Sequence, residues 1–484
     1  MTAVIVLLCL AGLLAFLLLV AVVRALRMRH TAPPAAAPPP NPDAAARYAE
    51  HLGRMIRCET LSAPDIDPAT TRPAFAQLRE VLQECYPRVF AQLEEIAIEE
   101  ATLLRWAGRD AARPAMLLLA HSDVVPATGA WQRSPFSGQV QDGKIWGRGA
   151  MDTKNTLCAM LEAAEALLAE GFVPACDVYF ASSHNEEKMG PGAVRVRDWL
   201  VANGVQLALV LDEGGCVTQN PLPGLGDGWF AMVGLVEKGY ANVRFTARSA
   251  GGHASTPPQN SPLARLAAFA AQVEKHPPFP TAMPPVVRDM LAVLAPYMEF
   301  RYRLLFGNLW LFAPLAKRVL CRFGPQAAAL LRTTCAFTMA AGSAAPNVLP
   351  ETATLTANLR FIMHQGMDAS LAAIEEVATR YGLEMEVLYA NDIFPTADTE
   401  SPAYRFAKAT VEKAFPEAAP CPYIMVAGTD ARHFAPLCNC TLRFSPAILS
   451  AQQRASMHGL NENSDVASLA RGVHFYTLLL RDYV

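Results

Sequence analysis

The chain has 484 residues, and its 41 Lys and Arg nearly balance its 44 Asp and Glu, for a formal net charge of −3. This length exceeds what one hydrophobic core supports, so we expect two or more domains. No basic patch or run is present, which argues against nucleic acid as a partner. The eleven cysteines are scattered and odd in number, a pattern that predicts neither a disulfide framework nor a Cys-x-x-Cys zinc site.

The N-terminal segment predicts a membrane anchor. Residues 3–23 form an apolar run of 21 residues without a charge, which is long enough to span a bilayer. A cleaved signal peptide is the alternative, although the positively charged start of such peptides is missing here. Arg24, Arg27 and Arg29 follow the run and favour a cytoplasmic location for the rest of the chain. Residues 31–42 are rich in Pro and Ala and predict an extended linker.

The next segment, residues 43–236, alternates helical and strand patterns. Short apolar strands are expected at "AMLLLA", "DVYFASS" and "LALVLDEGG", with amphipathic helices between them. This alternation predicts an α/β domain, with a mostly parallel sheet flanked by helices. The same rhythm resumes in residues 392–484, which we assign to the same catalytic domain.

Residues 237–391 follow a different order, β-α-β-β-α-β, which is typical of a small ferredoxin-like α+β domain. We therefore predict a lid or dimerisation domain inserted into the larger one, with a homodimer as one consequence. It contains an apolar insert at about 277–330. That insert is either additional core or a dimer contact, or else an apolar lid that accepts an acyl chain or leans on the bilayer.

Polar side chains follow the expected strand "AMLLLA" directly. His121 and Asp123 are two residues apart, so in an extended segment both point to the same side at the end of the strand. In open α/β sheets that end is where ligands and active sites collect. A polar loop that happens to begin with histidine is the alternative for this motif taken alone.

Further acidic and imidazole groups follow other expected strands or lie in loops of the larger domain: Asp152, Glu186, Glu187, Asp212 and His458. Each has an ordinary structural explanation when taken alone. Carboxylates gathered at one edge of a sheet would repel each other without a cation. Imidazoles and carboxylates without thiolates suit a zinc-type hydrolytic site, and a bridging carboxylate suits a pair of ions.

Six motifs occur in order: "HSDVVPA", "GRGAMDTK", "HNEEKMG", "GGHASTPP", "NVLP" and "MHGLNENS". Together they resemble the family of metallopeptidases that comprises acetylornithine deacetylase, succinyl-diaminopimelate desuccinylase and carboxypeptidase S. The resemblance covers residues 43–484. The segments "PFSG" and "DGKIWGRGAMD" are most similar to the carboxypeptidase S branch, which includes the N-fatty-acyl amino acid synthase/hydrolases.

The resemblance implies a role for each motif residue. Two Zn²⁺ ions would be held by His121, Asp152, Glu187, Asp212 and His458, with Asp152 bridging. Whether Asp212 or Glu213 of "DEGG" is the ligand stays open, with strand-end placement favouring Asp212. Asp123 would orient His121, and Glu186 would be the general base.

The resemblance also implies substrate-binding groups. His253 would stabilise the oxyanion, often reaching over from a neighbouring subunit in this family. Asn347 and Arg360 would hold the substrate carboxylate, and Gly428 and Thr429 would line the pocket.

The expected function is hydrolysis of an amide bond next to a free carboxylate, in a small peptide or an N-acyl amino acid. Reversible condensation of a fatty acid with an amino acid is the alternative within the same branch. A non-catalytic binding protein with the same fold is more remote, because the ligand set and Glu186 are complete.

Overall fold

The computed structural model describes residues 2–28 and 42–483. These residues form two compact units, each with its own core. Of the described residues, 2–27, 237–292 and 300–394 belong to the first unit, and 28, 42–236, 293–299 and 395–483 belong to the second. The linker predicted at 31–42 lies outside the described residues except for Pro42.

The main sheet of the second unit contains eight strands within the described ranges, in the order β1-β2-β6-β3-β7-β16-β8-β15. The four central strands β6, β3, β7 and β16 pair in parallel, whereas β1, β2 and β8 pair antiparallel with their neighbours. The α/β expectation is therefore confirmed, with the parallel part confined to the middle of the sheet. The strands are β1 (Glu94–Ile98), β2 (Ala101–Trp106), β3 (Ala115–Leu119), β6 (Val178–Ser183), β7 (Leu207–Gln219), β8 (Trp229–Glu237), β15 (Ala418–Met425) and β16 (Thr441–Ile448).

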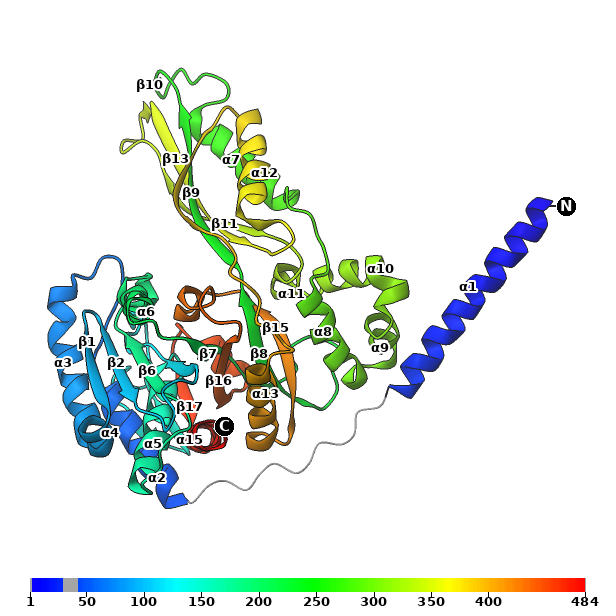
Figure 1. Cartoon of the computed structure of the whole chain (residues 1–484). Helices are drawn as coiled ribbons and strands as arrows, with labels where there is room; N and C mark the ends of the chain where they lie inside the picture. The colour runs from blue at the N-terminus through cyan, green and yellow to red at the C-terminus, as the bar shows by residue number, and fades with distance from the viewer. Residues whose placement is uncertain (1, 29–41, 484) are drawn as a thin grey trace. The chain divides into compact units, whose positions relative to one another are not determined.

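Helices flank this sheet, as Figure 1 shows. α5 packs against α2 and α15, and α6 packs on β2 and β6. α5 is buried along almost its whole length, since its sequence is apolar on nearly every face. The helices are α2 (Pro42–Ile56), α3 (Pro68–Cys85), α4 (Pro87–Gln92), α5 (Lys154–Ala169), α6 (Gly192–Ala202), α13 (Pro402–Ala414), α14 (Ala451–Ser456) and α15 (Val466–Asp482).

Shorter elements of the second unit carry loops of the candidate site. They are the 3₁₀ turns η1 (Glu186–Lys188) and η3 (Asp430–His433), and a small sheet of β4 (Gln139–Gln141), β5 (Lys144–Trp146) and β17 (Asn463–Asp465).

The first unit contains a four-stranded antiparallel sheet in the order β11-β13-β9-β14. Along β9, buried Ala241, Val243 and Phe245 alternate with partly exposed residues, and the buried face packs against α7 and α12. The chain order is β9 (Gly239–Arg248), α7 (Pro262–Lys275), β11 (Thr334–Ala341), β13 (Thr352–Phe361), α12 (Gly366–Arg380) and β14 (Glu384–Asn391), with the short pair β10 (Gly252–His253) and β12 (Val348–Leu349) in the loops. This is the β-α-β-β-α-β order of a ferredoxin-like domain.

Between α7 and β11 the chain folds into short helices: α8 (Pro285–Leu294), η2 (Ala295–Tyr297), α9 (Phe300–Phe306), α10 (Leu309–Arg322) and α11 (Pro325–Ala329). The N-terminal helix α1 (Thr2–Arg27) belongs to the same unit and contacts α9 (Figure 1). By length and composition α1 could cross a membrane, a property that signal sequences share.

Candidate metal centre

The candidate site lies at the carboxyl ends of neighbouring parallel strands in the second unit. His121 follows β3, Glu186 and Glu187 form η1 just after β6, and Glu213 lies within β7. Asp152 precedes α5, and His458 follows α14. Parallel strands end at the same edge of a sheet, so residues far apart in sequence meet there.

These side chains form two groups that share one carboxylate. In the first, His121 Nε2 lies 2.9 Å from Asp152 Oδ1 and 3.3 Å from Glu213 Oε1. In the second, His458 Nε2 lies 2.8 Å from Asp152 Oδ2 and 3.3 Å from Glu187 Oε2. Within each group the ligand atoms lie within 4.8 Å of one another. Asp152 therefore offers one oxygen to each group.

Asp123 positions the side chain of His121 and the loop that carries Glu186 and Glu187. His121 Nδ1 lies 2.9 Å from the backbone oxygen of Asp123 and 3.3 Å from its carboxylate, which leaves Nε2 to face the first group. The same carboxylate accepts hydrogen bonds from the backbone N–H groups of Glu186 and Glu187, both at 3.1 Å. This fully buried residue thus positions one imidazole and the loop with both glutamates.

The structure departs from the sequence expectation at "DEGG". Asp212 turns away from the cluster: Oδ1 accepts a hydrogen bond from Glu213 N–H at 2.8 Å, and Oδ2 accepts one from Ala431 N–H at 2.7 Å. The carboxylate that reaches His121 is that of Glu213. The reason is that β7 does not end at Asp212 but continues to Gln219, so strand-end placement does not apply.

The residues present fit divalent metal. Glu187 Oε1 is buried without a hydrogen-bond partner among the described residues, which is costly unless a cation completes its environment. Hydrogen bonds to Asp152 and Glu187 raise the pKa of His458 to about 11, so the cluster attracts positive charge. All donor atoms are imidazole nitrogen or carboxylate oxygen, the set that zinc hydrolases use.

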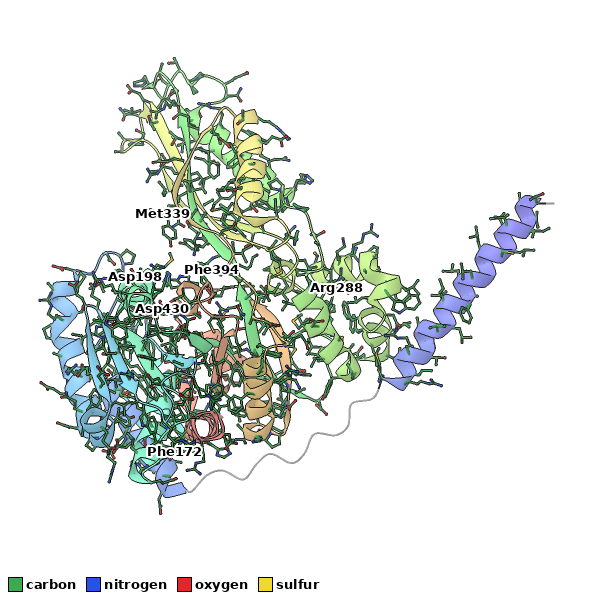
Figure 2. All side chains as sticks on the ribbon, viewed as in Figure 1. Phe172, Asp198, Arg288, Met339, Phe394 and Asp430 are labelled. Carbon is green, nitrogen blue, oxygen red and sulfur yellow. The ribbon has the colours of Figure 1, made fainter. Side chains whose placement is uncertain are left out.

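Glu186 lies beside the two groups without belonging to either. Burial raises the pKa of its carboxyl group well above the ordinary value, and Arg432 Nη1 lies 3.6 Å from Oε1. Asp430, labelled in Figure 2, accepts a hydrogen bond from Ser183 Oγ, and burial raises its pKa as well. A buried carboxyl group beside two groups of candidate metal ligands, with a guanidinium nitrogen 3.6 Å away, can exchange a proton.

A buried ion pair next to Asp152 was not predicted from the sequence. Arg148 Nη1 donates to Glu462 Oε2 at 2.6 Å, and Glu462 Oε1 accepts from the N–H groups of Gly149 and Met151 at 3.1 and 2.8 Å. The pair ties the loop of Asp152 to the loop of His458. Both residues lie inside the motifs "GRGAMDTK" and "MHGLNENS", which was the available signal.

The proposed substrate-binding residues divide between the units. His253, Asn347 and Arg360 belong to the first unit, whereas Gly428 and Thr429 belong to the second. His253 Nδ1 lies 2.7 Å from Ser255 Oγ, and the Asn347 backbone oxygen accepts from Ala254 N–H at 3.0 Å.

The guanidinium of Arg360 lies over the Tyr240 ring, 4.5 Å from its centroid, and its Nε donates to Asn358 Oδ1 at 3.2 Å. Thr429 is buried, and its backbone oxygen accepts from Arg432 Nη1 at 2.8 Å. The substrate roles of these five residues stay predictions.

A large hollow in the second unit is separate from this cluster. Its volume is about 800 Å³, and it lies between α3 and β1, β2 and β6, with Phe75, Leu78, Ile96 and His184 in its lining. None of the ligand side chains lines it. The volume of a hollow alone would therefore not have identified the candidate metal centre.

Residues 117–482 match the model of peptidase family M20/M25/M40. The N-fatty-acyl-amino acid synthase/hydrolase PM20D1 of Xenopus tropicalis is 33% identical, over 90% of this chain and 85% of that protein. The probable carboxypeptidase S-like 2 of Dictyostelium discoideum is 32% identical, over 90% of this chain and 84% of that protein.

Among solved structures, the metallo-carboxypeptidase Sso-CP2 of Sulfolobus solfataricus has a TM-score of 0.62 at 17% identity, covering 90% of this chain and 98% of that one. Human carnosine dipeptidase 1 has a TM-score of 0.60 at 15% identity, covering 90% and 97%. Together with the cluster of acidic and imidazole ligands, the match over most of the chain identifies it as a metal-dependent amide hydrolase that belongs to peptidase family M20/M25/M40.

Proposed function

We propose that this chain binds two Zn²⁺ ions and hydrolyses the amide bond between an acyl group and an amino acid with a free carboxylate. The observation that carries the proposal is the position of Asp152, one oxygen of which faces His121 and the other His458. Glu213 and Glu187 complete the two groups, so we propose His121, Asp152, Glu213, Glu187 and His458 as the ligands.

Bound zinc would polarise the substrate carbonyl and make water a better nucleophile. The chain supplies the proton transfers. Glu186 would accept the proton of the attacking water at its carboxylate and deliver it to the leaving amine nitrogen. Asp123 supports this role, since its carboxylate holds the backbone of Glu186 and Glu187 in place.

Substrate recognition is assigned to both units. Arg360 offers a planar guanidinium, which suits the free carboxylate of the substrate, with Asn347 as a second polar group. His253 would stabilise the oxyanion of the tetrahedral intermediate, and Gly428 and Thr429 would line the pocket. A homodimer through the first unit would be one way to supply His253.

We further propose that α1 is kept as a membrane anchor rather than cleaved. Ala21 and Ala25 are fully buried although they belong to an otherwise exposed apolar helix. The backbone oxygen of Ala21 also accepts a hydrogen bond from Asn308 Nδ2 at 3.0 Å. These contacts between the end of α1 and the folded unit support an α1 that stays attached to the chain. Arg24 and Arg27 favour the cytoplasmic side.

The substrate class is tested on the full-length, zinc-loaded chain with three kinds of amide: dipeptides, N-acetyl amino acids and N-long-chain-acyl amino acids. Preference for dipeptides or short acyl groups supports a carboxypeptidase, and preference for long acyl groups supports an N-fatty-acyl amino acid hydrolase. Condensation of a free fatty acid with an amino acid, measured in the same preparation, tests the reversible reaction, which the named relatives favour.

Metal dependence is the first prediction. Chelation should abolish amide hydrolysis, and zinc or a similar divalent ion should restore it, because the cluster offers only oxygen and nitrogen ligands. Metal content is measured by elemental analysis alongside activity. Full activity in a verified metal-free preparation would exclude the mechanism.

The second prediction separates the base from the bridge. Glu186→Gln should keep both metal ions and lower kcat by about 10²–10⁴-fold, the usual size of lost general acid–base catalysis. Asp152→Ala should instead lower metal occupancy, because it removes a ligand from both groups. Loss of metal in Glu186→Gln with full occupancy in Asp152→Ala would contradict these roles.

A further inference from the structure

We infer that α9 and α10 form a membrane-seated element, whose apolar surface enters the interfacial layer of an anionic lipid bilayer beside α1. The inference rests on the anchor proposed above and is independent of the reaction at the metal centre. The partner that we infer for the apolar insert of the first unit is thus the lipid bilayer.

A chain of hydrogen bonds joins α10 to α1. Trp310 Nε1–H donates to Asn308 Oδ1 at 3.2 Å, and Asn308 Nδ2 donates to the backbone oxygen of Ala21 at 3.0 Å. Asn308 is fully buried at the bend between α9 and α10. The start of α10 therefore lies next to the last apolar turn of α1.

This contact fixes the depth of the insert in a bilayer. The apolar run 3–23 has 21 residues. As a helix it is about 32 Å long, close to the hydrocarbon thickness of about 30 Å. Ala21 lies two residues before the end of the run, at the boundary with the headgroups. Trp310 lies at that same level, where tryptophan is enriched in membrane proteins because its ring is apolar and its N–H polar.

The insert exposes large apolar side chains on both α9 and α10. Trp310 is 50% exposed, Leu315 is 48% exposed and Phe300 is 41% exposed. α9 and α10 meet at 115°, and with 7 and 14 residues each is too short to span a bilayer by itself. Helices with an apolar face and basic flanks lie in the interface rather than across the membrane, and we infer this placement for the pair.

The charge of these helices suits anionic lipid. Residues 2–27 and 300–322 contain no Asp or Glu. They contain seven cations: Arg24, Arg27, Arg301, Arg303, Lys317, Arg318 and Arg322. Basic residues that flank an apolar surface attract the negative surface of a membrane, and their long side chains reach the headgroups while their stems stay apolar. A protein partner would not need this match between apolar depth and flanking charge.

The test uses the full chain in vesicles of phosphatidylcholine and phosphatidylglycerol whose acyl chains carry bromine, a quencher of tryptophan fluorescence. Trp310 is the only tryptophan of the first unit, since the other five lie in the second. Bromolipid quenching should be present in the wild type and lost in Trp310→Phe, whereas Trp199→Phe, a control in α6, should retain it. Vesicles without phosphatidylglycerol should give less quenching.

A second measurement, which does not depend on the Trp310 variant, is needed in case that variant fails to fold. A spin label at Leu315→Cys should be accessible to oxygen dissolved in the bilayer, and one at Leu263→Cys should be accessible to a water-soluble relaxant. Both are exposed leucines of the same unit, in α10 and α7. Native Cys9, Cys321 and Cys335 are replaced by serine in these two variants, because none of the three is fully buried.

Native Cys9, in the middle of α1, reports on the anchor separately. Protection of Cys9 from a water-soluble maleimide, together with quenching of Trp310, supports the inference. Protection of Cys9 without quenching of Trp310, and with Leu315 open to the water-soluble relaxant, overturns the seating of α10 and leaves the anchor intact. Labelling of Cys9 overturns both, while amide hydrolysis measured in the same preparation is unaffected.

Discussion

At the scale of single residues, the ligand at "DEGG" gives the sharpest prediction. Glu213→Gln should lower the zinc bound per chain from two towards one, with a loss of affinity larger than the ~10–100-fold typical of groups that only orient a ligand. Asp212→Asn should keep both ions, because the Asp212 carboxylate accepts hydrogen bonds from the backbone N–H groups of Glu213 and Ala431. Zinc titration of the two variants decides, and the opposite pattern would restore Asp212 as ligand.

The buried pair of Arg148 and Glu462 gives a prediction on stability. Arg148→Met leaves Glu462 buried without its cation, which should lower the free energy of unfolding by about 3–5 kcal/mol. The exposed pair of Lys408 and Glu412 is the control, since Lys408→Met should cost only about 0–1 kcal/mol. Denaturant unfolding of the two variants measures both values, and equal effects would show that the buried pair has no special role.

The positions of single side chains could be predicted from the sequence where they follow directly from a strand. His121 and Asp123 lie just after β3, with the shared orientation that their spacing predicts. At "DEGG" strand-end placement favoured Asp212, whereas the side chain that faces His121 in the structure is Glu213. No local pattern marks that β7 continues beyond Asp212. The ion pair of Arg148 and Glu462 was not predicted either, since the two residues are 314 positions apart.

At the scale of elements, the junction between β8 and β9 contains a lysine in an unusual setting. Lys238 is buried, and its Nζ donates to the backbone oxygens of Ala329 and Arg332 at 3.0 and 2.9 Å. Burial, followed by the charges of Arg360 and Arg332, lowers the pKa of Lys238 to about 7. The junction therefore favours the neutral amine more than the unfolded chain does.

This lowered pKa predicts a pH dependence of stability. Between the folded value of about 7 and the unfolded value of about 10.5, the unfolded chain binds more protons, so the free energy of unfolding should rise with pH. The slope contributed is at most about 1.4 kcal/mol per pH unit. We expect the Tm of the wild type to rise from about pH 7 to 9 relative to Lys238→Met, measured by calorimetry. A constant difference would mean that Lys238 keeps an ordinary pKa.

Element order was the most predictable part of the fold. Apolar strands that alternate with amphipathic helices indicate an α/β sheet, and the central strands β6, β3, β7 and β16 are indeed parallel. The antiparallel pairing of β1, β2 and β8 was not predicted. The link between β1 and β2 is Glu99 and Glu100, which carry no turn signal, whereas the Gly- and Pro-rich segment 220–228 between β7 and β8 was an available signal.

At the scale of the whole molecule, the residues proposed for the reaction belong to both units. The metal ligands belong to the second unit, and His253, Asn347 and Arg360 belong to the first. Sequence motifs can identify such residues. The distances between them, however, depend on how the two units are arranged, which no motif determines. Geometry could therefore predict that imidazole and carboxylate side chains gather at one edge of the sheet, whereas the role of each ligand and the substrate-binding residues came from the resemblance.

The apolar insert is also the subject of a separate prediction, that it accepts the acyl chain of the substrate. For a series of N-acyl phenylalanines assayed in vesicles, kcat/KM should rise with acyl length, by up to about fourfold per methylene if each buries fully. Trp310→Ala should reduce this slope, because Trp310 is an exposed apolar side chain of α10. A flat series with an unchanged slope in the variant would leave the insert as packing alone, with short acyl groups or dipeptides as substrates.

The double use of Asp152 also sets the charge balance of the metal centre. The two groups together contain three carboxylates, Asp152, Glu187 and Glu213, where two separate sets of the same composition would contain four. With neutral imidazoles, these three negative charges would not neutralise the two divalent cations proposed above, and the ligand set would keep one positive charge. Such a surplus would attract anionic molecules by long-range electrostatics before any hydrogen bond forms. Sharing one side chain would thus favour the proposed substrates, which carry a carboxylate.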